Sequence, residues 1–208
     1  MDLNQIYDNV VDGNANEVKA GVQAALDEGT SPDIILNQAL VPAMDKVGRL
    51  FEEGEFFVPE MLIAARAMQS GLALLKPHLL ESGVKAAGRV AIGTVKGDLH
   101  DIGKNLVAMM LEGAGFEVRD LGTDVSPQSF VQSAQDGAQV IGMSALLTTT
   151  MTNMGATIQA LQAAGLRDQV KVIVGGAPVT EAFAQKIGAD GFAPDASSAV
   201  RAVRAMVE

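Results

Sequence analysis

The sequence predicts two domains: a small bundle of helices, followed by an α/β domain built on a doubly wound parallel sheet. Apolar residues recur at helical spacing through roughly the first eighty residues. From residue 89 onward, short runs rich in valine and isoleucine alternate with helical stretches. Strands that alternate with helices in this way indicate parallel pairing, with helices on both faces of the sheet. We therefore expect a helical domain at residues 1–86 and an α/β domain at residues 87–208.

The first four helices are bounded by recognisable start and stop signals. Ser31-Pro32, for example, supplies an N-cap residue followed by proline at the first helical position, and Gly54 ends the helical pattern that follows. Helices with short connections indicate a four-helix bundle. They are expected at residues 3–11, 14–26, 32–51 and 58–75.

The second half of the chain contains five predicted strands, each followed by a helix. The strands are expected at residues 89–94, 116–120, 139–144, 171–175 and 190–193. The helices are expected at residues 102–114, 126–137, 150–164, 179–187 and from residue 196 onward. Five parallel strands favour the flavodoxin-like order 2-1-3-4-5. Residues 81–88, ESGVKAAG, are small and polar, and we expect them to link the two domains.

The composition excludes several classes of protein. The chain has no cysteine, which excludes disulfides, zinc–thiolate sites and iron–sulfur clusters. It has no apolar run long enough to predict a transmembrane helix. Its N-terminus also lacks the basic and apolar regions of an export signal, so a cytoplasmic location is expected.

The charge balance argues against nucleic acid binding. The net charge is −10, with 13 acidic and 6 basic residues in 1–86 and 12 acidic and 9 basic residues in 87–208. The sequence shows no cluster of basic residues of the kind that neutralises a phosphate backbone. Most acidic side chains are expected to form a solvated surface that keeps the protein soluble.

The segment TVKGDLHDIGKN, residues 94–105, follows the first predicted strand and holds one of the two histidines of the chain. In doubly wound sheets, ligands bind outside the carboxyl ends of the strands, where the connections change direction. This position alone makes the segment a candidate binding site.

Three interpretations of this segment compete. The spacing from Gly97 to Gly103 is one residue too long for a phosphate-binding P-loop, and Asn105 stands where that motif has Ser or Thr. A histidine beside an acidic residue is also common in ordinary surface loops. The third interpretation takes residues 98–103 together as a DxHxxG pattern.

The DxHxxG pattern of Asp98, His100 and Gly103 resembles the cobalamin-binding motif of corrinoid methyltransferase proteins and of methionine synthase. Four further segments resemble the same family in the same order along nearly the whole chain. They are VGRLFEEGEFFVP at residues 47–59, SALLTTT at 144–150, the glycine pair at 175–176 and FAPDA at 192–196. Five motifs in the right order favour the corrinoid interpretation over the other two.

The resemblance implies that the chain binds cobalamin or a related cobamide, with His100 as the lower axial ligand of cobalt. Imidazole is a good ligand for such a metal, and its second ring nitrogen needs a partner that sets its tautomer. Asp98 is expected to be that partner, and Thr150 is expected to continue the hydrogen-bonded chain. Asp101 and Ile102 are expected to touch the corrin face.

The resemblance also implies a slot beside the sheet for the displaced base of the cofactor. Close approach of the backbone favours glycine, so Gly103, Gly175 and Gly176 are expected there, although glycines are also common at turns. Further residues expected at the cofactor are Ser144, Leu146, Thr148 and Ala196.

The helical domain is expected to cover the upper face of the cofactor and to move aside for partner proteins, a motion that the linker would permit. The resemblance places Phe51, Val58 and Met61 over that face. Met44 and Met68 are expected either there or in the core of the bundle. His78, near the end of the fourth helix, is expected to have a capping or surface role.

The resemblance implies a corrinoid methyl carrier that serves two methyltransferases. Cobalt(I) would accept a methyl group from a donor on one partner, and methylcobalt(III) would give it to tetrahydrofolate or a thiol coenzyme on the other. A reductive activator is a further expected partner. Two alternatives remain open: a cobalamin-dependent sensor, which usually carries a DNA-binding helix-turn-helix, and the corrinoid subunit of a carbon-skeleton mutase.

Overall fold

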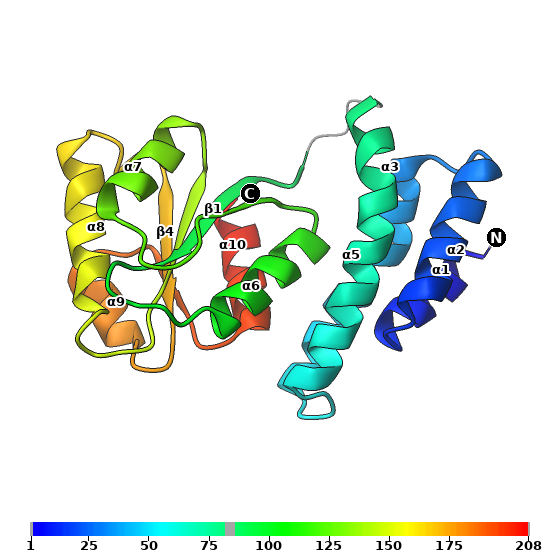
Figure 1. Ribbon diagram of the computed structural model, residues 1–208, viewed down its shortest axis with the longest axis horizontal. Helices are drawn as coiled ribbons and strands as arrows, with labels where there is room; N and C mark the ends of the chain where they lie inside the picture. The colour runs from blue at the N-terminus through cyan, green and yellow to red at the C-terminus, as the bar shows by residue number, and fades with distance from the viewer. Residues whose placement is uncertain (1, 82–85, 208) are drawn as a thin grey trace. The chain divides into compact units, whose positions relative to one another are not determined.

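The computed structural model describes residues 2–81 and 86–207, which form two compact units (Figure 1). The first unit contains the described residues up to Ala86 together with Met109–Gly115, and the second contains Ala87–Ala108 and the described residues from Phe116 onward. The domain limits 1–86 and 87–208 stay a prediction. The expected linker at 81–88 includes residues 82–85, which lie outside the described residues.

The first unit is helical throughout, as predicted. Its elements are α1 (Leu3–Val11), α2 (Ala15–Asp27), α3 (Pro32–Ile35), the π-helix η1 (Leu36–Leu40), α4 (Val41–Glu52) and α5 (Val58–Glu81). The long helix α5 packs against α2 and also contacts α1 and α4. Fully buried side chains fill the space between these helices, and they include Ile6, Val22, Leu40, Met61, Met68 and Leu75.

The predicted third helix is one continuous helical segment with a wide turn in its middle. At this turn the N–H of Val41 bonds to the carbonyl of Leu36, five residues earlier, instead of four. The next residue is Pro42, which has no N–H to donate. A π-turn at this point accommodates the missing donor, so the segment is divided into α3, η1 and α4.

The second unit confirms the predicted doubly wound sheet. Its five strands are all parallel and lie in the order β2-β1-β3-β4-β5, the predicted order. They are β1 (Arg89–Thr94), β2 (Glu117–Asp120), β3 (Val140–Ser144), β4 (Lys171–Gly175) and β5 (Gly191–Ala193). The helices that alternate with them are α6 (Ile102–Gly113), α7 (Pro127–Gln135), α8 (Thr152–Ala163), α9 (Glu181–Ile187) and α10 (Ala196–Val207). The part of α6 from Met109 onward is grouped with the first unit.

Helices cover both faces of this sheet: α7, α8 and α9 lie on one face, and α6 and α10 lie on the other (Figure 1). The core between the sheet and the first group contains Phe130, Ile141, Met154, Ile158 and Val172, all at most slightly exposed. Strands β1 and β3 lie in the interior of the sheet, so their carboxyl ends are held on both sides by neighbouring strands. Their connections leave to opposite faces, through α6 after β1 and through α8 after β3. The ends of β1 and β3 are therefore the switch point at which doubly wound sheets usually bind ligands.

Among the described residues, no helix is both long enough and apolar enough to cross a membrane.

Candidate functional site

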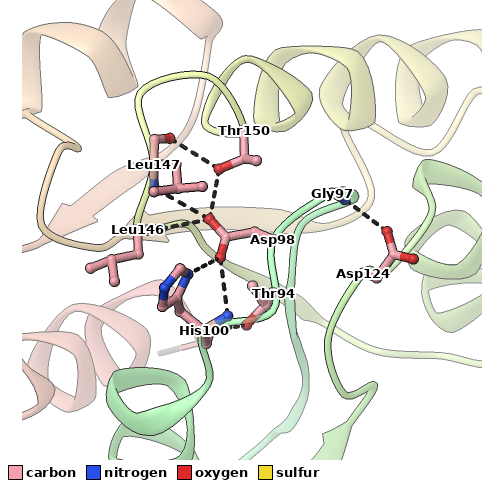
Figure 2. Close-up of polar contacts among 8 residues, drawn as sticks. All are labelled: Thr94, Gly97, Asp98, His100, Asp124, Leu146, Leu147 and Thr150. Carbon is pink, nitrogen blue, oxygen red and sulfur yellow. Dashed lines mark hydrogen bonds and ion pairs between the residues drawn. The ribbon is translucent and has the colours of Figure 1, made fainter.

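The loops that follow β1 and β3 meet at the buried carboxylate of Asp98 (Figure 2). Its Oδ2 atom accepts hydrogen bonds from the hydroxyl of Thr150 at 2.6 Å and from the backbone N–H of Leu146 at 2.8 Å and of Leu147 at 3.3 Å. Its Oδ1 atom faces His100. Asp98 belongs to the β1 loop, and the three donors to its Oδ2 atom belong to the β3 loop. This one carboxylate therefore joins the two loops.

The hydrogen bonds keep Asp98 ionised. Burial of the carboxyl group by itself raises its pKa, because the charged form loses its water. The hydrogen bonds from Thr150, Leu146 and His100 act in the opposite direction and outweigh it, so the pKa of Asp98 lies well below the ordinary value of an aspartate. The site therefore contains a fixed negative charge with no exposure to solvent.

His100 binds this charge through one ring nitrogen and turns the other outward. Its Nδ1 atom lies 2.7 Å from Oδ1 of Asp98, and its backbone N–H donates to the same oxygen at 3.1 Å. An ionised carboxylate only accepts hydrogen bonds, so Nδ1 carries the proton. The Nε2 atom then holds a free lone pair, and no described residue hydrogen-bonds to it. The side chain is 52% exposed, which leaves this nitrogen open to a ligand.

The backbone of His100 is held as firmly as its ring. The hydroxyl of Thr94, the last residue of β1, donates to the carbonyl of His100 at 2.9 Å. His100 is therefore fixed through its N–H, its carbonyl and Nδ1 within a short loop at the end of a buried strand. A metal ligand on such a support keeps one direction for its lone pair.

Exposed apolar residues flank the histidine in the sequence and also occur in the β3 loop. Leu99 and Ile102, on either side of it in the sequence, are 73% and 78% exposed, and Leu146 and Leu147 in the β3 loop are also exposed. Polar residues are more usual at exposed loop positions, so an apolar group of this kind indicates a binding surface. An outward imidazole among apolar side chains fits a large flat ligand that brings a metal with it.

The donor set supports the same interpretation. An imidazole is one of the axial ligands that a metal enclosed in a macrocycle takes from a protein.

The three predicted glycines fall into two kinds. A Cβ atom on Gly176 would lie 1.9 Å from the carbonyl oxygen of Ala145, and Gly176 also has a φ of +124°. A Cβ atom on Gly175 would lie 2.9 Å from the carbonyl oxygen of Ala193. The backbone itself requires these two glycines. Gly103 differs, because a Cβ atom there would meet no atom within 4 Å and its φ is not in the left-handed region.

The other predicted residues of the α/β unit lie at or after the carboxyl ends of β1, β3 and β5. Ser144 ends β3 and is half-buried, Thr148 is exposed in the β3 loop, and Ala196 is buried at the first position of α10. Asp101 accepts a hydrogen bond from the side-chain amide of Asn105 at 3.1 Å. Their contacts with a cofactor stay predictions.

The residues predicted over the upper face belong to the helical unit. Val58 is exposed at the first position of α5, Phe51 is half-buried in α4, and Met61 is fully buried. Full burial is typical of a core side chain, and Met44 and Met68 are buried in the same way. The role of Phe51, Val58 and Met61 toward a cofactor stays a prediction. His78 is exposed in the last turn of α5.

Sequence reasoning missed the backbone donors of the site and one buried charge. The N–H groups of Leu146 and Leu147 bind Asp98, and residue type carries no signal for such contacts. Lys104 follows Gly103 in the motif and is nearly fully buried, with Nζ 2.5 Å from Oδ2 of Asp120. A lysine in the first turn of a helix gives no sequence signal of burial, because lysines are usually solvated.

Comparison with known proteins identifies the family. The profile of the B12 binding domain matches residues 88–204, and a second profile with the same description matches residues 2–76. The chain belongs to the B12-binding family.

Two relatives align with this B12-binding chain over nearly all of its length. A corrinoid protein of Desulfitobacterium hafniense strain Y51 is 42% identical over 202 residues, covering 95% of this chain and 94% of the relative. The dimethylamine corrinoid protein of Methanosarcina barkeri is 45% identical over 201 residues, covering 95% and 93%. Among solved structures, the methanol:cobalamin methyltransferase complex MtaBC of Methanosarcina barkeri has a chain that matches with a TM-score of 0.86 and 30% identity. That match covers 99% of this chain and 79% of the other.

The hydrogen bond from Thr150 to Asp98 gives a first test of the site. Thr150→Val keeps the shape of the side chain but removes the donor, so it should lower the free energy of unfolding by about 1.5–3 kcal/mol, the usual effect of a hydrogen bond to a charged group. Unfolding in denaturant, followed by circular dichroism, measures this effect.

Thr152→Val is the matched control, because Thr152 is exposed and donates to the carbonyl of Thr149 at 3.0 Å. It should change stability by no more than about 0.5 kcal/mol. Equal changes in the free energy of unfolding would mean that the bond from Thr150 to Asp98 stabilises the protein no more than an exposed hydrogen bond does.

Proposed function

We propose that the protein is a corrinoid methyl carrier, which binds cobalamin or a related cobamide and passes a methyl group between two methyltransferases. The observation that carries this proposal is the histidine site: His100 is fixed by the buried carboxylate of Asp98 and presents a free Nε2 atom among exposed apolar side chains. Membership of the B12-binding family supports the choice of cofactor.

The residues of the site fit such a cofactor. His100 would be the lower ligand through Nε2, and Leu99, Ile102 and Leu146 offer apolar surface beside it. No atom of the described residues fills the space beside Gly103, so a part of the cofactor could approach the backbone closely there. When bound, the corrinoid supplies a cobalt centre that takes up and releases the methyl group.

The contribution of the chain to the reaction is orientation and charge. Asp98 holds the proton of the imidazole at Nδ1, which fixes the tautomer in which Nε2 is a ligand. Thr150 holds the carboxylate itself, so the relay from Thr150 through Asp98 to His100 sets the strength of the ligand. The apolar side chains exclude water from this side. Shielding of the other side by Phe51, Val58 and Met61 is part of the proposal.

The names of the relatives support the methyl-carrier role over the alternatives. Corrinoid proteins named for dimethylamine and a methanol:cobalamin methyltransferase complex resemble this chain over most of its length, and they give no support to a sensor. We infer a donor-side methyltransferase as the first partner. An acceptor-side methyltransferase and a reductive activator complete the proposed system.

A label-transfer experiment tests this function. The protein is loaded with hydroxocobalamin, reduced, and mixed with a dimethylamine methyltransferase and dimethylamine that carries a labelled methyl group. Label should elute with the protein and should leave it when an acceptor-side methyltransferase and a thiol coenzyme are added. Parallel reactions use methanol and its methyltransferase. A protein that binds the cofactor but takes up no label from either donor would contradict the carrier role.

The two histidines provide an internal comparison for the metal ligand. After reconstitution with hydroxocobalamin, His100→Ala should lose the absorption spectrum of the histidine-ligated cofactor, because the variant has no imidazole to present from the β1 loop. His78→Ala should keep the wild-type spectrum, since His78 is an exposed side chain in the last turn of α5. Loss of that spectrum in the His78 variant instead would contradict the assignment.

Gly103→Ala separates the demands of the fold from those of the cofactor. The fold has room for the methyl group, and alanine is favoured over glycine in a helix, so the apo-protein should gain up to about 1 kcal/mol in stability. Binding of hydroxocobalamin, measured by spectroscopic titration, should nevertheless weaken, because the methyl group occupies space that the cofactor needs. Unchanged binding would remove Gly103 from the site.

A further inference from the structure

The loop after β2 continues alongside β1 beyond the end of β2 itself. The N–H of Leu121 donates to the carbonyl of Ile92 at 2.8 Å, and the N–H of Thr94 donates to the carbonyl of Gly122 at 3.0 Å. Val95 and Val125 then form a parallel bridge. The β2 loop is therefore aligned with the start of the loop that carries the histidine.

Asp124 lies in this β2 loop in an unusual backbone conformation. Its φ is +53°, and it is the one non-glycine residue with positive φ among residues 2–81 and 86–207. This left-handed conformation is costly for most side chains, although aspartate and asparagine tolerate it better than others. A residue held in such a conformation is a reason to ask what the conformation achieves.

The conformation lets Asp124 bind two successive residues of the histidine loop. Its Oδ1 atom accepts a hydrogen bond from the N–H of Gly97 at 2.7 Å, and its own N–H donates to the carbonyl of Asp98 at 3.0 Å (Figure 2 shows the first of these). Gly97 also has a left-handed backbone, with a φ of +82°. Two left-handed residues thus face each other, and both polar groups of Asp124 are directed at the segment 97–98.

Asp98 is consequently held from two sides. The β3 loop holds its carboxylate through Leu146, Leu147 and Thr150, whereas Asp124 holds its main chain from the β2 loop. Apart from Asp124, the main chain of Asp98 itself is held within the described residues by one bond, from its N–H to the carbonyl of Val95 at 3.1 Å, which leaves its carbonyl side without a restraint. A pivot at Asp98 would redirect His100, because the backbone N–H and Nδ1 of His100 both bind Oδ1 of Asp98.

We propose that Asp124 is a positioning residue, which fixes the backbone at residues 97–98 and thereby the direction of the Nε2 atom of His100. We call the two hydrogen bonds of Asp124, with Gly97 and with Asp98, the clamp. What His100 binds rests on the function proposed above, whereas the clamp is a property of the apo-protein. Two features of the residue are required together: tolerance of the left-handed backbone, and a side-chain oxygen that accepts from Gly97.

Three substitutions separate these two features. Asp124→Asn keeps both the acceptor oxygen and the tolerance of positive φ. Asp124→Gly keeps the backbone conformation but removes the acceptor, and Asp124→Ala removes both. Asp136→Ala serves as the control, because Asp136 is an exposed aspartate whose side chain pairs with Arg119.

Two measurements follow the clamp. Spectroscopic titration with hydroxocobalamin gives the affinity and the fraction of cofactor with the histidine-ligated spectrum. Amide hydrogen exchange of the apo-protein, at Gly97 and Asp124, reports the clamp without any cofactor. Unfolding in denaturant shows whether each variant is folded.

The glycine and alanine variants should bind hydroxocobalamin about 10- to 100-fold more weakly, the range that corresponds to loss of one hydrogen bond to a charged group. They should also show a smaller histidine-ligated fraction, and the Gly97 amide should exchange faster in both. Asp124→Asn and Asp136→Ala should stay within about threefold of wild-type affinity, with wild-type spectra and exchange. If Asp124→Ala does not fold, the glycine variant decides.

Wild-type affinity and spectrum in the glycine variant would overturn the proposal, even if its stability falls, because the role of Asp124 would then be structural alone. A wild-type protein whose spectrum is the same as that of His100→Ala would instead contradict the proposed function. In that case exchange at Gly97 still decides whether the clamp exists. The two failures are therefore distinguishable.

Discussion

The buried carboxylate of Asp98 is the interaction on which the site depends. An ionised carboxylate without exposure to water is costly unless hydrogen bonds replace its hydration, and here the replacement comes from two loops far apart in the sequence. The β3 loop supplies the hydroxyl of Thr150 and two backbone N–H groups, and the histidine supplies the remaining donors. Asp98 can be buried only if these donors reach it, so its burial fixes how the β1 and β3 loops lie against each other.

That constraint also explains why a histidine suits the loop. A carboxylate that accepts from Nδ1 leaves one lone pair, at Nε2, and directs it away from the protein. Strands β1 and β3 are interior strands of the sheet, so the ends from which the loops depart are rigid on both sides. A nitrogen with one tautomer and one direction, on a rigid support, suits the metal-ligand role proposed for His100.

The sequence was sufficient to predict the fold because the three inner strands β1, β3 and β4 are largely buried and every connection contains a helix. Parallel strands with long crossovers admit few topologies, and the predicted order 2-1-3-4-5 is the observed one. The division of the third helix at Pro42 was not predicted, because a proline inside a helical pattern is absorbed here by a π-turn instead of ending the helix. In the site, Asp98, His100 and Thr150 were predicted from a family resemblance. The N–H groups of Leu146 and Leu147 could not be, since any residue type supplies a backbone donor.

Residues that the fold does not explain give the strongest argument for a binding site. Gly175 and Gly176 need no ligand to account for them, because the backbones of Ala193 and Ala145 leave no space for a side chain. Gly103 has open space, and Leu99 and Ile102 are apolar yet exposed. Each of these features weakens or fails to help an apo-protein, and all of them lie within the six residues of one motif. One bound ligand that covers this loop would account for these features together. The outward nitrogen of His100 indicates where that ligand binds.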